Sequence, residues 1–201
     1  MNDIKLYLIR HGKTYCNEQH LYYGKSDVEV CESGIEELMK KKDMIVYPDC
    51  DFYFTSGAKR ANQTLDVIKP NAKYMRISKL FEYDFGDFEL KSYEELKDIK
   101  EYKEWIIDEE GHIKCPQGES KLEFKNRVIS GFTELIQHLQ KENIKTALGV
   151  IHGGSIGIIL EILYDNKKKF YEWQPENGEG YELIITLKNN EQFEIEQVIR
   201  I

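Results

Sequence analysis

Short apolar runs rich in β-forming residues alternate along this 201-residue chain with longer segments of helical periodicity. The runs that predict strands lie at 4–9, 51–55, 74–77 and 146–151. The helical patterns lie at 33–44, 59–68, 120–141 and 155–163. Strands that alternate with helices form a mostly parallel sheet, because each parallel connection needs a crossover. The pattern therefore predicts an α/β fold, a three-layer sandwich whose central sheet is flanked by helices.

Local signals refine these elements. Ser33 is an expected N-cap, with Glu36 three residues later as in a capping box, for a helix that runs to about Met44. Pro70 is expected to end another helix, 59–68. The helix 120–141 has an apolar stripe at helical spacing, formed by Phe124, Val128, Phe132, Leu135 and Leu139. Two closing runs, 181–187 and 193–199, predict a hairpin around Asn189-Asn190.

The charge of the chain is concentrated in one segment. The chain has 28 Lys and Arg against 36 Asp and Glu, a formal net charge of −8. The stretch 82–110 holds twelve acids and four lysines, so it carries the whole excess. We interpret 84–118, with short helices expected at 92–99 and 101–107, as a small helical cap inserted into a single domain that spans 1–201. The negative balance argues against nucleic acid or an anionic membrane as a partner.

Compartment and metal content follow from what the sequence lacks. No apolar run approaches the length of a signal-peptide core or a membrane span, so we expect a cytoplasmic protein. The four cysteines, Cys16, Cys31, Cys50 and Cys115, are scattered without a C-x-x-C pair. This spacing predicts reduced thiols and no metal site.

Histidine and arginine residues follow three of the predicted strands. One strand leads into Arg10-His11-Gly12, another into His152-Gly153-Gly154, and a third into Thr55-Ser56-Gly57 with Arg60 at the start of the next helix. Binding sites of such sheets lie beyond the carboxyl ends of the strands. We therefore expect two imidazoles and two guanidiniums to converge there.

These groups fit phosphoryl transfer. Arginine binds phosphate through parallel N–H donors, and the helix that opens at Gly153-Gly154 favours an anion. A neutral histidine can attack phosphorus, and Glu82 is available to protonate the leaving oxygen. Either histidine alone would be read as structural, whereas two on separate strands, each followed by Gly, favour chemistry. Arg127 on the long helix is interpreted as a salt-bridge residue.

Six ordered blocks resemble the histidine phosphatase superfamily, the phosphoglycerate mutase-like proteins. The blocks are Arg10-His11-Gly12-Lys13-Thr14 with Asn17; Tyr23-Gly24 with Asp27 and Glu32-Ser33-Gly34; Thr55 to Thr64; Leu80 to Glu89; Pro116 to Ser120; and His152-Gly153-Gly154. The resemblance covers most of the chain and implies the fold predicted above.

The resemblance also implies roles for individual residues. His11 is the nucleophile, Glu82 the proton donor, and His152 the third catalytic residue. Arg10, Arg60, Asn17 and the amide of Gly153 bind the phosphoryl group, and Tyr23, Gly24 and Tyr83 are expected to contact substrate. No metal or organic cofactor is implied.

Departures from the family pattern occur at a few positions. Lys13 replaces the common Glu or Gln and is expected to add positive charge beside the nucleophile. Phe88 replaces a Trp, and Leu90 stands where a Gly usually follows. The last two changes bear on the geometry of the cap.

Three functions remain open at this stage. A metal-independent phosphatase acting on a small phosphorylated metabolite is favoured, because no arginine lies between Glu82 and Ser120, where the family's mutases carry an arginine-bearing insertion. The alternatives are a cofactor-dependent phosphoglycerate mutase and a non-catalytic phospho-ligand binding module. The acid-rich cap predicts that the rest of the substrate is neutral or cationic. The chain is expected to be a monomer or a homodimer.

Overall fold

A six-stranded sheet forms the centre of the molecule in the computed structural model, which describes residues 3–188 and 192–201. The strands are β1 (Asp3–Arg10), β2 (Phe52–Thr55), β3 (Met75–Arg76), β4 (Thr146–Ile151), β5 (Gly180–Leu187) and β6 (Phe193–Arg200). Their order in the sheet is β3-β2-β4-β1-β5-β6. The first four pair in parallel, whereas β5 and β6 are antiparallel. The predicted α/β fold with a mostly parallel sheet is confirmed.

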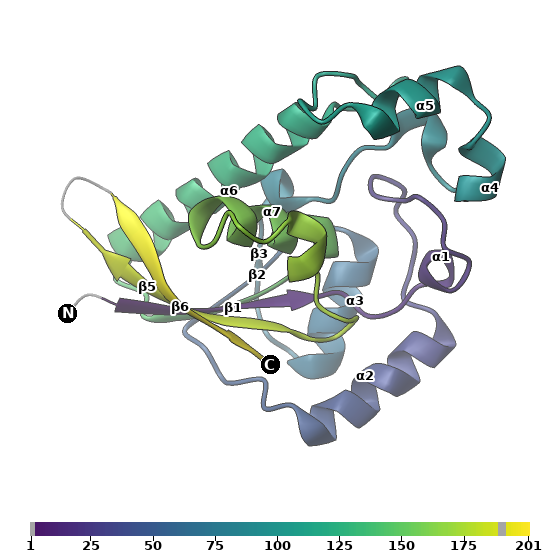
Figure 1. Cartoon of the computed structure of the whole chain (residues 1–201). Coiled ribbons are helices and arrows are strands. Elements are labelled where there is room, and N and C mark those ends of the chain that lie inside the picture. The colour runs from purple at the N-terminus through teal and green to yellow at the C-terminus, as the bar shows by residue number, and fades with distance from the viewer. Residues whose placement is uncertain (1–2, 189–191) are drawn as a thin grey trace.

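Helices cover both faces of this sheet (Figure 1). On one face lie α2 (Glu32–Met44) and α3 (Lys59–Ile68), and on the other lie α6 (Lys121–Lys141) and α7 (Gly153–Leu163). Short helical segments occupy the connections; they are α1 (Tyr15–Glu18), η1 (Ser78–Leu80), η2 (Gly86–Phe88), α4 (Tyr93–Leu96), α5 (Lys100–Ile107) and η3 (Phe170–Trp173).

The sequence of β1 explains the three layers. Ile4, Leu6 and Leu8 point into the core beneath α6 and α7, whereas Tyr7 and Ile9 point into the core beneath α2 and α3. Successive side chains of a strand point to opposite faces. A central strand with apolar residues on both sides is therefore buried twice, and the sheet needs helices on both faces.

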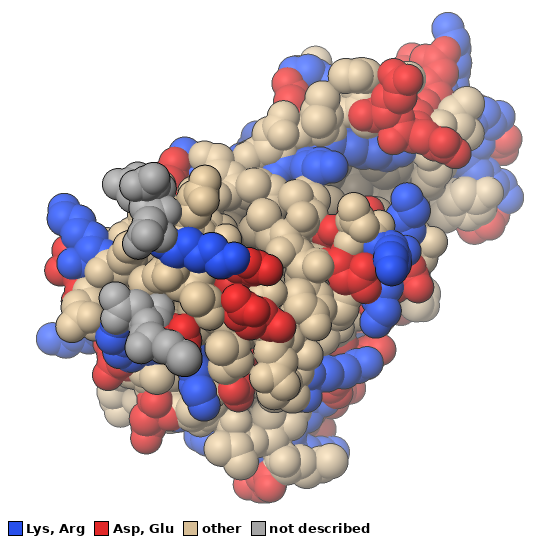
Figure 2. Space-filling view, turned by 60° about the vertical axis from the view of Figure 1, so that its left-hand side comes forward, with Lys and Arg blue, Asp and Glu red and all other residues tan. Residues whose placement is uncertain are grey.

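The segment 84–118, for which we keep the name cap, projects beyond the sheet near the start of α6 (Figure 1). Its aromatic side chains, Phe88, Tyr102 and Trp105, are buried and join the core beneath α6 and α7. Figure 2 shows acidic side chains, with lysines among them, gathered at the end of the molecule that the cap forms. The cap is thus anchored by its aromatic residues and presents its charges outward.

The two helices α6 and α2 differ in how they begin. Ser120 caps α6 as the capping box with Glu123 requires. The expectation that Ser33 caps α2 is wrong: the helix begins at Glu32 after the N-cap Cys31, and the Ser33 hydroxyl donates to Glu18 instead, at 2.7 Å. The turn around Asn189-Asn190 lies outside the described residues, but the predicted antiparallel pairing of its two strands is present. No helix within the described ranges is long and apolar enough to cross a membrane.

Candidate active site

The chain leaves β1 at His11, whose ring is buried at the carboxyl end of the sheet. Its Nδ1 lies 2.8 Å from the backbone oxygen of Gly12. A carbonyl oxygen only accepts hydrogen bonds, so Nδ1 carries the proton and Nε2 keeps its lone pair. Burial lowers the pKa of His11 well below its usual range, and the guanidiniums of Arg60 and Arg10 lower it further. The ring is therefore a neutral imidazole with a free nucleophilic nitrogen.

The second histidine, His152, ends β4 and lies next to the first. The two ring centroids are 5.3 Å apart. Its Nδ1 is 3.3 Å from Nη2 of Arg60, which can only donate, so Nε2 carries the proton and donates to the Ser56 hydroxyl at 2.8 Å. Burial lowers the pKa of His152 as well, and Arg60 contributes to the shift. Ser56, which the sequence placed at a strand end without a role, thus orients this ring.

Two arginines converge on the histidines. Arg60 is fully buried at the start of α3, where its guanidinium donates to the carbonyl oxygens of Gly24 and Ser26. Arg10 donates to the carbonyl of Pro175 at 2.8 Å. The Nε–H groups of both arginines are buried, and neither has a hydrogen-bond partner among the described residues. Such unsatisfied donors are rare in folded proteins, and two of them beside two imidazoles fit an anion.

The N-terminus of α7 completes this anion-binding surface. Gly153 begins the helix next to the Arg10 side chain, since a Cβ added at Gly153 would lie 3.2 Å from Nε of Arg10. Gly154 N–H donates to the Glu82 carboxylate at 2.8 Å, which ties the acid to the helix start. A side chain at Gly154 would lie 2.4 Å from that carboxylate, so glycine is required there. Free N–H groups at a helix start favour a phosphoryl group.

Glu82 is held at the start of α7. Its carboxylate accepts hydrogen bonds from the N–H groups of Tyr83 and Gly154. Burial raises the pKa of Glu82, and these hydrogen bonds together with Arg60 and Arg10 oppose only part of that rise. A carboxyl group with a raised pKa beside a neutral imidazole is a pair suited to acid and nucleophile.

The loop after α1 lies against Arg60. Tyr23 is buried, its ring lies 4.9 Å from the Arg60 guanidinium carbon, and its hydroxyl donates to Oδ1 of Asn17 at 2.8 Å. Asn17 Nδ2 donates to no described residue and is available to a ligand. Gly24 gives its carbonyl to Arg60. The structure thus brings Asn17, Tyr23 and Gly24 to the pocket.

Tyr83, unlike Asn17, Tyr23 and Gly24, packs within the cap. Its hydroxyl donates to the backbone oxygen of Glu119 and accepts from the indole of Trp105, and its ring packs against Phe85 and Phe124. The side chain is buried inside the base of the cap. Tyr83 therefore packs the cap and holds the backbone next to Glu82.

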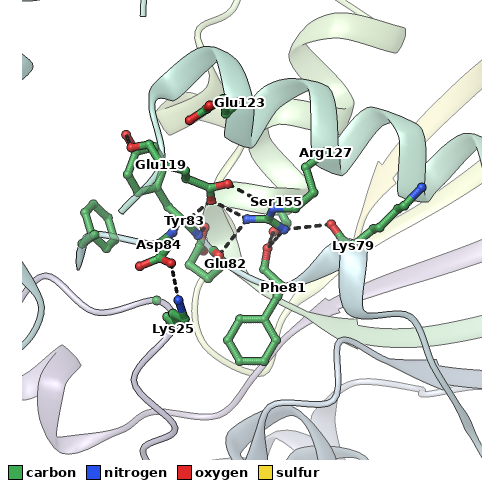
Figure 3. A network of polar contacts seen from close by, with 12 residues as sticks. Lys25, Lys79, Phe81, Glu82, Tyr83, Asp84, Glu119, Glu123, Arg127 and Ser155 are labelled. Atoms are coloured by element: carbon green, nitrogen blue, oxygen red, sulfur yellow. Dashed lines mark hydrogen bonds and ion pairs between the residues drawn. The ribbon is translucent and has the colours of Figure 1, made fainter. Parts of the chain in front are cut away.

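The sequence did not predict the structural roles that Glu89 and Arg127 have at the site. The Glu89 carboxylate accepts hydrogen bonds from the N–H groups of Gly24, Lys25, Ser26 and Phe85, so it fixes the loop after α1 to the cap. Arg127, interpreted as a salt-bridge residue, does pair with Glu119, and it also donates to backbone oxygens of the segment that carries Glu82 (Figure 3). Both contacts join residues far apart in the chain, so no local motif marks them.

Lys13 does not add its charge to the nucleophile. Its ammonium group lies 3.2 Å from Glu37 and 3.7 Å from Glu18, and these acids raise its pKa. Within residues 3–188 and 192–201, no group of three or more His, Cys, Asp or Glu side chains is arranged to hold a metal ion.

The comparisons with known proteins agree with this site. The model of the histidine phosphatase superfamily, branch 1, matches residues 6–196. The chain belongs to this superfamily. The resemblance seen in the sequence blocks is thereby confirmed.

The relatives that are similar to this chain include proteins named as phosphatases and proteins named as mutases. An adenosylcobalamin/alpha-ribazole phosphatase of Escherichia coli (strain K12) is 27% identical over 161 residues, which cover 78% of this chain and 77% of that protein. A 2,3-bisphosphoglycerate-dependent phosphoglycerate mutase of Pseudoalteromonas atlantica is 27% identical over 187 residues, which cover 77% and 82%. The superfamily assignment therefore supports phosphatase or mutase chemistry.

Solved structures show the same fold. An alpha-ribazole phosphatase from Shigella flexneri superposes with a TM-score of 0.80 at 23% identity and covers 98% of this chain and 96% of its own. A phosphoglycerate mutase from Bacillus anthracis superposes with a TM-score of 0.77 at 20% identity, with 98% and 92% covered. At these identities the likeness concerns the fold alone.

Proposed function

We propose that this protein is a metal-independent phosphatase that hydrolyses a small phosphomonoester through a phosphohistidine intermediate on His11. The observation that carries the proposal is the neutral His11 imidazole, with Nε2 unprotonated, among two arginines whose Nε donors have no partner. These arginines would neutralise the charge that spreads over the equatorial oxygens during transfer. The substrate we propose is a small phosphorylated metabolite.

The reaction would proceed in two steps. In the first, Nε2 of His11 forms a bond to phosphorus while the bond to the leaving oxygen breaks, and Glu82 gives its proton to that oxygen. In the second, Glu82 as carboxylate takes a proton from water, which attacks phosphorus and displaces His11. Inorganic phosphate leaves, and His11 and protonated Glu82 are restored. Arg10, Arg60, His152, Asn17 and the Gly153 amide hold the phosphoryl group in both steps.

Mutase chemistry is the alternative, since a relative named as a mutase is similar over a comparable share of the chain. A mutase must hold a second phosphate while it excludes water. No arginine stands between Glu82 and Ser120 to bind one. This absence favours hydrolysis.

The test compares wild type with His11→Ala on p-nitrophenyl phosphate, with and without EDTA. We expect release of inorganic phosphate by the wild type, unchanged by EDTA, and none by the variant. Labelled substrate should leave an acid-labile label on the wild-type chain only. Isomer interconversion that depends on 2,3-bisphosphoglycerate, without release of phosphate, would establish the mutase instead. Tight phosphate binding without turnover of any phosphomonoester would indicate a binding module.

A further inference from the structure

A cavity of about 580 Å³ has Glu82 in its wall, together with Phe81, Arg76 and Asp84. Its volume is that of a small-molecule site. In the proposed reaction Glu82 protonates the leaving oxygen, so the leaving group departs along the wall that Glu82 forms. The charges of this cavity therefore bear on which leaving group it accepts.

Three carboxylates of the wall are already satisfied by fixed partners. Asp84 accepts from the Lys25 ammonium group at 2.7 Å. Glu119 is paired with Arg127. Asp27 accepts from the N–H of Lys59 at the start of α3, also at 2.7 Å. Lys25 and Arg127 thus compensate the charges of Asp84 and Glu119, whereas Asp27 accepts from a neutral backbone N–H and keeps its charge.

Arg76 is the exception among the charged groups of the wall. It lies in β3, and its side chain passes over Gly57, where an added Cβ would meet Arg76 Nε at 2.1 Å. The side chain thus lies against the turn that carries Ser56, the partner of His152. Arg76 is exposed, and within the part of the chain that the structure describes its side chain makes no hydrogen bond or ion pair with another residue. Its guanidinium charge is available to a ligand.

The excess of acidic residues in the cap does not prevent Arg76 from binding an anion. Of the residues in 82–110, only Glu82 and Asp84 line the cavity. Other acids of that stretch pair with lysines of the cap itself, as Glu94 does with Lys97 and Glu104 with Lys100. The expectation of a neutral or cationic leaving group rested on the whole excess, most of which lies outside the cavity.

We propose that Arg76 is a specificity-determining residue that binds a carboxylate on the leaving group, so that the preferred substrates are phosphomonoesters of small hydroxy acids. A guanidinium binds a carboxylate through two parallel N–H donors. The single guanidinium of Arg76, with the Asp27 carboxylate in the same wall, suits a carboxylate monoanion better than a second phosphate dianion. The inference rests on the proposed phosphatase function.

The test uses matched substrate pairs that differ in the carboxylate, namely phosphoglycolate against ethyl phosphate and 3-(phosphonooxy)propanoate against propyl phosphate. For wild type we expect a higher kcat/KM on the acid of at least one pair. In Arg76→Gln the ratio of kcat/KM, acid over neutral, should fall about 10- to 100-fold, mainly through KM, as expected for loss of a charged hydrogen-bonded pair. Arg76→Lys should recover part of the ratio. Lys73→Gln, an exposed cation just before β3, should leave the ratio unchanged.

Failure of this inference is separable from failure of the phosphatase proposal. An unchanged ratio in Arg76→Gln, or equal losses on acid and neutral substrates, overturns the role of Arg76 while hydrolysis of p-nitrophenyl phosphate still establishes the phosphatase. Calorimetric binding of phosphoglycolate to the inactive His11→Ala variant, with and without Arg76→Gln, reports the subsite without turnover. Equal affinities of the two would also overturn it.

Discussion

Arg127 donates through Nη2 to the backbone oxygen of Glu82 at 3.0 Å (Figure 3). Its Nη1 donates to the carbonyl oxygens of Lys79 and Phe81, both at 2.9 Å. Glu119, which pairs with this guanidinium, also accepts from the N–H of Asp84 at 3.0 Å. The backbone on both sides of Glu82 is therefore held by one ion pair between α6 and the loop before it.

Arg127→Met should displace Glu82 and slow the step in which it donates a proton. A misplacement of about 1 Å can cost roughly 100-fold in rate. The loss should be larger for ethyl phosphate than for p-nitrophenyl phosphate, because nitrophenolate leaves without protonation. Lys125→Met, an exposed position on the same helix, is the matched control. Equal losses on both substrates would mean that Arg127 contributes stability only.

The pH profile of kcat/KM should report Glu82 and His11. The first step needs neutral His11 and protonated Glu82. Burial lowers the pKa of His11 from 6.5, so the acid limb should lie below that pH. Burial raises the pKa of Glu82 from 4.5, so its protonated form persists above that pH before activity falls. The optimum on alkyl phosphates should therefore lie between the acid limb set by His11 and the alkaline limb set by Glu82.

Glu82→Gln tests the assignment of the alkaline limb. Glutamine fills the same space but cannot give up a proton, so hydrolysis of ethyl phosphate should fall about 100- to 10,000-fold. The residual activity should lose the part of the alkaline limb that belongs to Glu82. Ionisation of the substrate phosphate affects both enzymes alike and cancels in the comparison. A variant that keeps the wild-type alkaline limb would assign that limb to another group.

Glu89→Ala should loosen the loop after α1, which lies against Arg60. Four backbone N–H groups lose their carboxylate acceptor, and two of the loop carbonyls they position, those of Gly24 and Ser26, hold Arg60. We expect a loss of about 1–3 kcal/mol in the free energy of unfolding, measured by urea denaturation, together with a raised inhibition constant for inorganic phosphate. Glu89→Gln keeps an acceptor oxygen and should lose less. An unaltered unfolding midpoint in Glu89→Ala would refute the clamp.

The fold and the centre of the site were predictable because their signals are local. His11 and His152 each follow an apolar strand, and the carboxyl ends of parallel strands meet at one edge of the sheet. The contacts of Arg127 with Glu82 and of Glu89 with Gly24 span 45 and 65 residues, so they depend on how the cap packs. The packing of Tyr83 could not be foreseen for the same reason. A tyrosine next to the acid is compatible with a contact to substrate, and only the positions of Trp105 and Glu119 show that its hydroxyl is engaged within the protein.

Leu90 offers a test of the cap that leaves the catalytic groups untouched. Its φ is +60°, a left-handed conformation that costs a side chain with a Cβ about 1–2 kcal/mol, and its side chain is 43% exposed. Its N–H donates to the oxygen of Tyr22 at 2.7 Å, which fixes that conformation. Leu90→Gly should relieve the strain and, after the added entropy of the unfolded chain, raise stability by about 0.5–1 kcal/mol, or roughly 1–4 °C in Tm. Leu90→Ala keeps the Cβ and loses only the exposed side chain, so it should bring no gain in Tm measured by calorimetry. A Tm for Leu90→Gly at or below that of Leu90→Ala would show that the backbone here carries no strain that glycine can relieve.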